Sequence, residues 1–243
     1  MPARPAWIRK KCWPVLAAAR QHHRELANIT WLEADALAGK HEINPLVLEA
    51  LRGLCRAHPE GSLKLVSNLP YNAASPLVAE LLVAMWQEGR RQAGGALAFS
   101  LLAFTVQYEV AERMRAAPDT SDYGPLGILI QLLGEVEILR KIPPGAFWPP
   151  PKVHSALVRV VPDRQKMARV PDAVGLQKLL AALFSHRRQK LSNALRHTLA
   201  ERYTPELAGR IGAAGIDLTL RPENIRPGQY LQLAELVAAI SPA

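Results

Sequence analysis

Apolar positions along this 243-residue chain follow two spacings, and together they predict an α/β fold. Continuous or alternating apolar runs predict strands, whereas spacings of three and four residues predict helices. We expect strands at residues 28–33, 63–66, 96–104, 135–142 and 154–161. We expect helices at residues 43–57, 75–86, 106–117 and 126–133. This alternation indicates a largely parallel sheet, and the last two strands indicate an antiparallel hairpin at its edge.

Two of these predictions carry local detail. The run at residues 63–66 reads as a buried strand, because Leu63, Leu65 and Val66 are apolar. The following helix is expected to start with Ser75 as N-cap and Pro76 in its first turn.

The C-terminal third of the chain shows helical spacing only. The composition turns polar and charged around residues 162–171, where we place a domain boundary. Beyond it we expect helices at residues 173–185, 187–202, 205–213 and 227–240. The sequence therefore predicts three parts: an atypical basic segment at 1–27, an incomplete α/β domain at 28–162 and a small all-α domain at 172–243.

Composition narrows the class of protein. The formal net charge is +9 and the isoelectric point is near 9.9, which favours a polyanionic partner. No uncharged apolar run reaches the roughly 18 residues of a membrane span. Cys12 and Cys55 are the only cysteines and lack metal-ligand spacing, as expected in a reducing compartment. We expect a cytoplasmic monomer with no metal and no membrane association.

The strand at residues 63–66 leads into the most informative motif, Asn68-Leu69-Pro70-Tyr71. A strand end of this kind lies at the carboxyl edge of an α/β sheet, where ligands bind. The Asn68 side-chain oxygen can accept from an exocyclic amine, and Pro70 restrains the backbone so that nearby carbonyls can point at the same amine. Tyr71 offers a flat face for a base. The motif predicts a clamp for a flipped adenine; the alternative is an ordinary turn.

Two further residues are candidates for the same site. Phe147 stands in a proline-rich loop that also carries Lys152, and a fixed aromatic there could cover the second face of a base. The alternative is a phenylalanine that fills the core. Asp35 follows the strand expected at residues 28–33, where a carboxylate could accept from the adenine amine of a cofactor; the alternative is a helix cap.

A basic run stands in the C-terminal part. Residues 184–200 contain no acid, and their cations are Arg187, Arg188, Lys190 and Arg196. We expect this run to open a helix near His186 and to bind phosphates with strong salt dependence. The alternative is a solvated basic face.

These motifs, in this order, resemble the ribosomal RNA adenine dimethyltransferases that modify small-subunit rRNA. The resemblance covers about residues 28–240. It is carried by Asn68-Leu69-Pro70-Tyr71, Glu109-Val110-Ala111-Glu112-Arg113-Met114, Asp122-Tyr123-Gly124-Pro125-Leu126, Phe147-Trp148-Pro149-Pro150-Pro151-Lys152-Val153, Ser155-Ala156-Leu157-Val158-Arg159, the basic run, and Arg221-Pro222-Glu223-Asn224 with Gln229-Tyr230.

The resemblance implies a Rossmann-like domain that binds S-adenosyl-L-methionine, followed by a small helical domain. It implies direct SN2 methyl transfer to N6 of two adjacent adenines near the 3′ end of the rRNA, within the immature small ribosomal subunit. In this scheme Asn68 and the carbonyl of Pro70 hold the amine, and Tyr71 and Phe147 stack on the base. Asp35 and Asn68 contact the cofactor, and neither a metal nor a covalent intermediate is needed.

The N-terminal segment departs from the family. Residues 1–24 hold six Lys or Arg and two Trp, but no glycine and no acid, so they cannot supply a Gly-rich loop or a ribose-binding acid. We expect that this stretch is not native domain sequence, that the natural protein carries a further first strand and loop, and that the chain as written binds S-adenosylmethionine weakly or not at all.

Further departures are Tyr108, where the family often has Lys, and His154, where it often has Asp. Two alternatives stay open beside the small-subunit enzyme. One is a catalytically inactive RNA-binding protein that lacks the cofactor loop. The other is a methyltransferase of large-subunit rRNA that confers antibiotic resistance; the loop of residues 147–153 and the final helices favour the small-subunit group.

Overall fold

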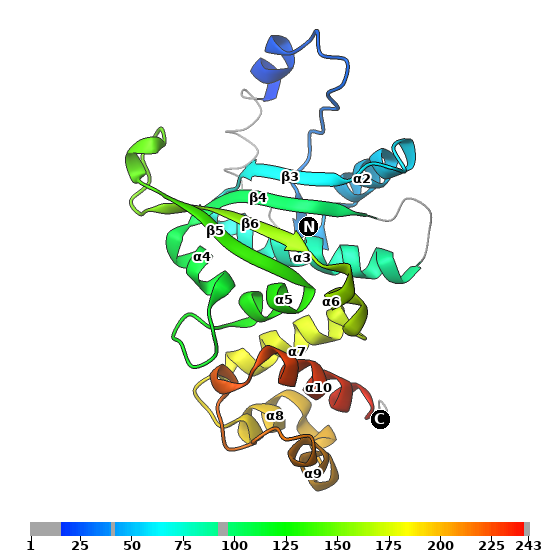
Figure 1. The fold of residues 1–243 in the computed structure, drawn as a ribbon, viewed down its shortest axis with the longest axis vertical. Coiled ribbons are helices and arrows are strands. Elements are labelled where there is room, and N and C mark those ends of the chain that lie inside the picture. The colour runs from blue at the N-terminus through cyan, green and yellow to red at the C-terminus, as the bar shows by residue number, and fades with distance from the viewer. Residues whose placement is uncertain (1–15, 40–41, 92–96, 241–243) are drawn as a thin grey trace.

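A four-stranded sheet forms the centre of the computed structural model, which describes residues 16–39, 42–91 and 97–240 (Figure 1). Its order is β3-β4-β6-β5, namely β3 (Leu63–Asn68), β4 (Phe99–Gln107), β6 (Ser155–Pro162) and β5 (Gly134–Ile142). Strands β3, β4 and β5 run in one direction and β6 in the other, so β3–β4 is the one parallel pairing among the described strands. Strand β6 is antiparallel to both β4 and β5, so the expected hairpin is confirmed, whereas the expected largely parallel sheet is, in the described residues, a mixed one.

Strand β3 lies at an edge of this sheet, and the prediction of a buried strand is wrong. Its residues alternate between half-buried and exposed, and the Val66 side chain is 76% exposed. The periodicity of four apolar residues cannot tell a central strand from an edge strand, because that difference depends on the pairing partners. The central strand is β4, whose Leu102, Phe104 and Val106 are fully buried.

Helices cover one face of the sheet (Figure 1). They are α3 (Tyr71–Arg91), α4 (Tyr108–Arg115) and α5 (Pro125–Leu133). Helix α2 (Pro45–Ala57) precedes β3 and starts two residues after the expected position, with Pro45 in the first turn and the Asn44 side chain accepting from Leu46 N at 3.0 Å.

Helix α3 begins four residues before the expected start. The Pro70 carbonyl accepts from Ala73 N at 2.9 Å and from Ala74 N at 3.1 Å, so the first helical turn follows directly on the strand end. Pro76 consequently lies inside the helix rather than in its first turn. The strong N-cap signal of Ser75 was misleading because the hydrogen bonds of Pro70 decide the start.

The C-terminal helices form a bundle below the sheet in Figure 1. They are α7 (Ala173–Ser185), α8 (Leu191–Leu199), α9 (Pro205–Ala213) and α10 (Pro227–Ala238), with the short α6 (Arg164–Arg169) at the expected boundary. Two of the bundle helices, α7 and α10, pack on α5. Tyr123 ties the two parts together, because its Oη donates to the Ile225 carbonyl at 2.8 Å. The Phe184 ring on α7 contacts the rings of both Tyr123 and Tyr230, and Tyr230 Oη donates to the Pro222 carbonyl within the C-terminal part at 2.5 Å. One continuous apolar core therefore runs from the sheet into the bundle.

The segment before α2 differs most from its prediction. Residues 16–22 are helical, and residues 28–33 form no strand. A strand needs a neighbour for its backbone groups, and this segment pairs with none of the described strands. Instead β1 (Leu37–Gly39) and β2 (Glu42–Ile43) make a small separate hairpin. Residues 1–15 and the glycines at 94 and 95 lie outside the described residues.

Candidate adenine site at the end of strand β3

Three neighbouring strands bring polar side chains to one edge of the sheet. Asn68, the last residue of β3, pairs in register with Thr105 of β4. Two residues further along β4, Gln107 pairs with Ser155, the first residue of β6. The candidate residues Asn68 and Tyr71 thus share this edge with Thr105 and Ser155, which the sequence analysis did not select as site residues.

The Asn68 amide is oriented by its neighbour. Thr105 Oγ1 donates a hydrogen bond to Asn68 Oδ1, and the Asn68 side chain stays exposed. An amide oxygen has two lone pairs, so Oδ1 retains one for a further donor such as an exocyclic amine. In the sequence, Thr105 could be noticed as a hydroxyl residue near the end of an otherwise apolar strand. Its contact with Asn68, however, follows only from the register between the two strands.

A hydroxyl group on β6 holds the Tyr71 side chain, as the Thr105 hydroxyl on β4 holds Asn68. Tyr71 Oη lies 2.7 Å from Ser155 Oγ, and Ser155 is fully buried. Burial of a hydroxyl without a partner would be costly, so this contact fixes the tyrosine ring at the first turn of α3. The Pro70 carbonyl, by contrast, already accepts from Ala73 N and Ala74 N, and an amine would have to share that oxygen.

The loop between β5 and β6 carries Phe147 and ends at Ser155. Phe147 directly follows the short 3₁₀ helix η1 (Pro144–Ala146), and its N–H donates to the Pro144 carbonyl at 3.1 Å. The ring is half-buried, and Lys152 further along the loop is exposed. No ring contact joins Phe147 to Tyr71 among the described residues. The loop is placed beside the clamp, and the stacking role of Phe147 stays a prediction.

Tyr108 occupies the position where the family often has Lys, and a cation still stands beside it. The Lys141 ammonium lies 4.4 Å from the centre of the Tyr108 ring. A hydrogen bond with Glu112 raises the pKa of the Tyr108 phenol. The backbone N–H of Tyr108 donates to the His154 carbonyl at 2.9 Å and fastens the end of the proline-rich loop to α4.

Asp35 is not placed at a strand end of the central sheet, contrary to the prediction. It precedes β1, and its Oδ1 accepts from Leu37 N at 3.3 Å, so it caps no helix either and makes a local contact at the start of a short strand. Its contact with a cofactor stays a prediction.

A glycine-rich loop is also absent from the described strand ends. The two parallel strands β3 and β4 end in Asn68 and Gln107, and neither is followed by such a loop. The described residues therefore do not make up a complete pocket for S-adenosylmethionine.

The basic run lies on a turn rather than at the start of a helix. Arg187, Arg188 and Lys190 stand between α7 and α8, and all three side chains are exposed. Helix α8 begins only at Leu191, because Leu191 N and Ser192 N donate to the carbonyls of Leu220 and Leu218 in a neighbouring segment. The expected helix start near His186 is therefore wrong.

Arg196 is the one predicted cation on α8. Its guanidinium lies 5.6 Å from the centre of the Tyr203 ring and donates to Asn193 Oδ1 at 3.1 Å. The rings of His186 and His197 stack at 4.7 Å beside it. Arg187, Arg188 and Lys190 therefore precede the first residue of α8, whereas Arg196 lies in its last turn, and their joint role in phosphate binding stays a prediction.

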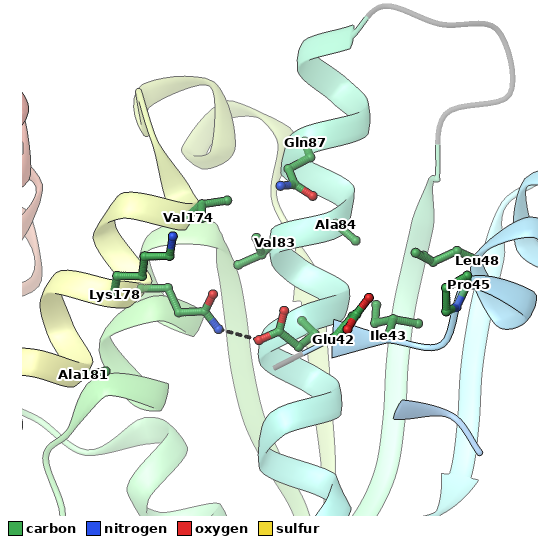
Figure 2. Close-up of a pocket in the computed structure, with 12 residues that line it drawn as sticks. Glu42, Ile43, Pro45, Leu48, Val83, Ala84, Gln87, Val174, Lys178 and Ala181 are labelled. Atoms are coloured by element: carbon green, nitrogen blue, oxygen red, sulfur yellow. Dashed lines mark hydrogen bonds between the residues drawn. The ribbon is translucent and has the colours of Figure 1, made fainter. Parts of the chain in front are cut away.

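A separate groove of about 430 Å³ lies between α3 and α7 (Figure 2). Its wall is mostly apolar, with Val83 and Ala84 on α3 and Val174 on α7. At one side Gln177 donates to Glu80 Oε1 at 2.7 Å. None of the predicted site residues is among its described lining residues, so this groove is distinct from the strand edge at Asn68.

Neither a metal centre nor a membrane span emerges from the described residues. Within residues 16–39, 42–91 and 97–240, no group of three His, Cys, Asp or Glu is placed to hold a metal ion. In the same ranges no helix is long and apolar enough to cross a membrane.

Comparison with known sequences connects these features to one family. The profile of the ribosomal RNA adenine dimethylase family matches residues 14–239. The chain is similar to the ribosomal RNA small subunit methyltransferase A of Chromobacterium violaceum, with 36% identity over 89% of this chain and 77% of that protein. Proteins of the same name from Acinetobacter baylyi and Pseudomonas putida are 34% and 38% identical over 85% and 74% of this chain. Those alignments span 65% and 61% of the two relatives.

Two solved structures share the fold. A dimethyladenosine transferase from Plasmodium falciparum superposes with a TM-score of 0.64 and 20% identity, over 89% of this chain and 74% of that one. The 23S rRNA methyltransferase ErmE superposes with a TM-score of 0.52 and 20% identity, over 93% and 78% of the two chains. At this identity the likeness concerns the arrangement of the elements, a mixed α/β methyltransferase-like fold.

Proposed function

This chain belongs to the ribosomal RNA adenine dimethylase family, and we propose that it methylates N6 of two adjacent adenines near the 3′ end of small-subunit rRNA. The observation that carries the proposal is the polar edge at the end of β3. There Thr105 orients the Asn68 amide and Ser155 holds Tyr71. The small subunit is favoured because the three curated relatives compared above are named small-subunit methyltransferases.

The edge suits the recognition of an amine on a flat base. In the proposed complex the adenine N6 amine donates one hydrogen to the remaining lone pair of Asn68 Oδ1, while its nitrogen lone pair points away toward the methyl donor. Orientation of the reacting atoms and polarisation of the amine are the contributions this edge can make to the rate. Pro70 adds a second acceptor only if its carbonyl shares a helix hydrogen bond.

Stacking compensates the cost of base flipping. Removing an adenine from its stack costs a few kcal/mol. Tyr71, fixed by Ser155, would support one face of the base, and Phe147 of the proline-rich loop would cover the other. Each stacking contact contributes roughly 1–3 kcal/mol, so the two together offset the flipping cost.

S-adenosylmethionine is the methyl donor implied by the family. Asp35 and Asn68 are the residues we assign to it, and they do not form a complete pocket without a glycine-rich loop. Weak binding of the donor by the chain as written stays a prediction.

The rRNA itself would be held by the basic side chains. We propose that Arg187, Arg188, Lys190 and Arg196 contact phosphates from the turn before α8 and from its last turn, and that Lys152 does so beside the clamp. The net charge of +9 supports a polyanionic partner of this kind.

A second candidate function is RNA binding without methyl transfer. The absence of a glycine-rich loop after β3 and β4 in the described residues favours it. It makes the same use of Asn68, Tyr71 and the basic side chains. The two candidates differ in one observable, the appearance of a methylated adenine.

The test is a methylation assay on small subunits that lack the modification, analysed by mass spectrometry of the rRNA 3′ end. The donor is supplied above about 1 mM, the upper end of ordinary KM values. We expect methylated adenine with the unsubstituted 243-residue chain, called the natural chain from here on. We expect at least a tenfold lower rate with Asn68→Ala, because the amine is no longer oriented. Asn28→Ala, an exposed asparagine outside the site, is the matched control.

Two outcomes would count against the proposal. RNA binding with no methylated adenine at any donor concentration would establish the second candidate instead. An Asn68→Ala variant as fast as the Asn28→Ala control would show that the end of β3 is an ordinary turn.

A further inference from the structure

Trp148 is a large apolar side chain presented almost entirely to solvent. Its side chain is 94% exposed, more than any other exposed large apolar residue of the described chain, of which Val66 at 76% comes next. Tryptophan is highly buried on average in folded proteins, so an exposed ring is informative about binding. Trp148 stands in the loop that joins β5 and β6, at the left end of the sheet in Figure 1.

This loop restrains the backbone that carries the ring before any partner arrives. Prolines at 143, 144, 149, 150 and 151 restrict its backbone on both sides of Trp148. The Pro143 and Pro144 carbonyls accept from the N–H groups of Ala146 and Phe147, both at 3.1 Å. Pairing of Ile142 with Ser155 closes the base of the loop. A preorganised aromatic loses little conformational entropy on binding, which favours its use as an anchor.

The loop that carries Trp148 and the strand residues on either side of it are basic in sequence. Residues 138–162 contain no acid and include Arg140, Lys141, Lys152 and Arg159. Arg159 pairs with Glu137 across the hairpin, whereas Arg140, Lys141 and Lys152 all stand exposed. An exposed aromatic among cations is the combination that binds single-stranded nucleic acid, because the ring stacks on a base and the cations contact the phosphates.

The ring also has a defined position relative to the adenine clamp. Phe147 has extended backbone angles, φ −120° and ψ 152°. Successive side chains of an extended segment point to opposite sides. Phe147 is half-buried and Trp148 is exposed, so the two rings face different ways from one loop. If Phe147 covers the flipped adenine, Trp148 faces the RNA outside the clamp.

We propose that Trp148 is a stacking platform for an unpaired nucleotide that flanks the target adenine, with Lys152 and Arg140 contacting the adjoining phosphates. The proposal rests on the proposed function and deepens it, because it assigns a specificity-determining contact outside the clamp. The partner is single-stranded RNA, and the contact requires neither the methyl donor nor the clamp itself.

The test is a coupling experiment between the ring and one base. Dissociation constants are measured by fluorescence anisotropy for a small-subunit rRNA 3′-end fragment and for versions with one abasic nucleotide at each unpaired position around the target. The proteins are the natural chain, Trp148→Ala, Trp148→Phe, and Leu46→Ala as a matched exposed apolar control on α2. A thermal melt confirms that each variant is folded.

We expect Trp148→Ala to raise the dissociation constant for the intact RNA about tenfold, within the range of base stacking, and Trp148→Phe to keep most of the affinity. One abasic position should weaken binding of the natural chain by a similar factor and leave Trp148→Ala unaffected. Leu46→Ala should bind like the natural chain.

An unchanged dissociation constant for Trp148→Ala would overturn the proposal while leaving the proposed function intact, and would point to a protein partner for this ring. The proposal would also be overturned if the loss of binding free energy caused by Trp148→Ala simply added to the loss caused by each abasic nucleotide. The ring and the base would then contribute to binding independently of each other. If the natural chain binds no RNA fragment, both the proposal and the proposed function fall.

Discussion

At the scale of single residues, the candidate site depends on two hydroxyl groups that orient the predicted side chains. Asn68 and Tyr71 could be predicted because a polar amide and an aromatic follow an apolar strand. Thr105 and Ser155 were not selected as site residues, since their contacts depend on the register between strands that are far apart in sequence. Asp35 was placed wrongly because its segment was expected to be a strand, and a strand exists only where a partner can pair with it.

Thr105 offers the sharpest prediction at this scale. In Thr105→Val the donor to Asn68 Oδ1 is lost, so the amide can rotate and should orient the adenine amine less well. We expect a two- to tenfold lower methylation rate, the range of one net hydrogen bond. Thr105→Ser keeps the hydroxyl and is the control that should stay near the natural rate. Equal rates for the Val and Ser variants would show that the Thr105 contact does not support the site.

At the scale of elements, local periodicity predicted most helices and strands, whereas tertiary hydrogen bonds decided where several of them begin. Helices α2, α5, α7 and α9 lie close to their expected positions because apolar spacing agrees there with an N-terminal signal, which is Asp172 as N-cap for α7 and a proline in the first turn for the other three. Helix α8 starts later than expected, since the backbone of Leu191 bonds to the Leu220 carbonyl. The arginines before it consequently stand on an exposed turn.

This turn carries the prediction for RNA binding. In Arg187→Ala/Arg188→Ala, two phosphate contacts are removed, so the slope of log affinity against log salt should flatten by roughly 1.4–1.8, about 0.7–0.9 for each contact. The measurement is a salt titration with a small-subunit rRNA 3′-end fragment. Arg164→Ala/Arg169→Ala, two exposed arginines on α6, is the matched control and should keep the natural slope. The same slope in both double variants would mean that the turn faces solvent.

At the scale of the whole molecule, the α/β class and the terminal hairpin were predictable, and the order of the sheet was not. Periodicity identifies strands but not their neighbours, so it could not show that β3 is an edge strand or that the described sheet is mixed. The helical C-terminal part was expected as a separate domain. Its apolar core is continuous with that of the sheet through Tyr123 and Tyr230. The apolar spacing of a single helix does not show which other elements that helix packs against.

In the proposed function of the whole molecule, the end of β3 recognises the N6 amine of an adenine in small-subunit rRNA. The most direct test compares two rRNA 3′-end fragments that differ only at the target base, adenine in one and purine, which lacks the amine, in the other. Dissociation constants are measured for the natural chain and for Asn68→Ala. We predict that the natural chain binds the purine RNA two- to tenfold more weakly, the range of about one hydrogen bond, and that Asn68→Ala binds both RNAs alike. Equal binding of the two RNAs by the natural chain, or undiminished discrimination by Asn68→Ala, would contradict the account.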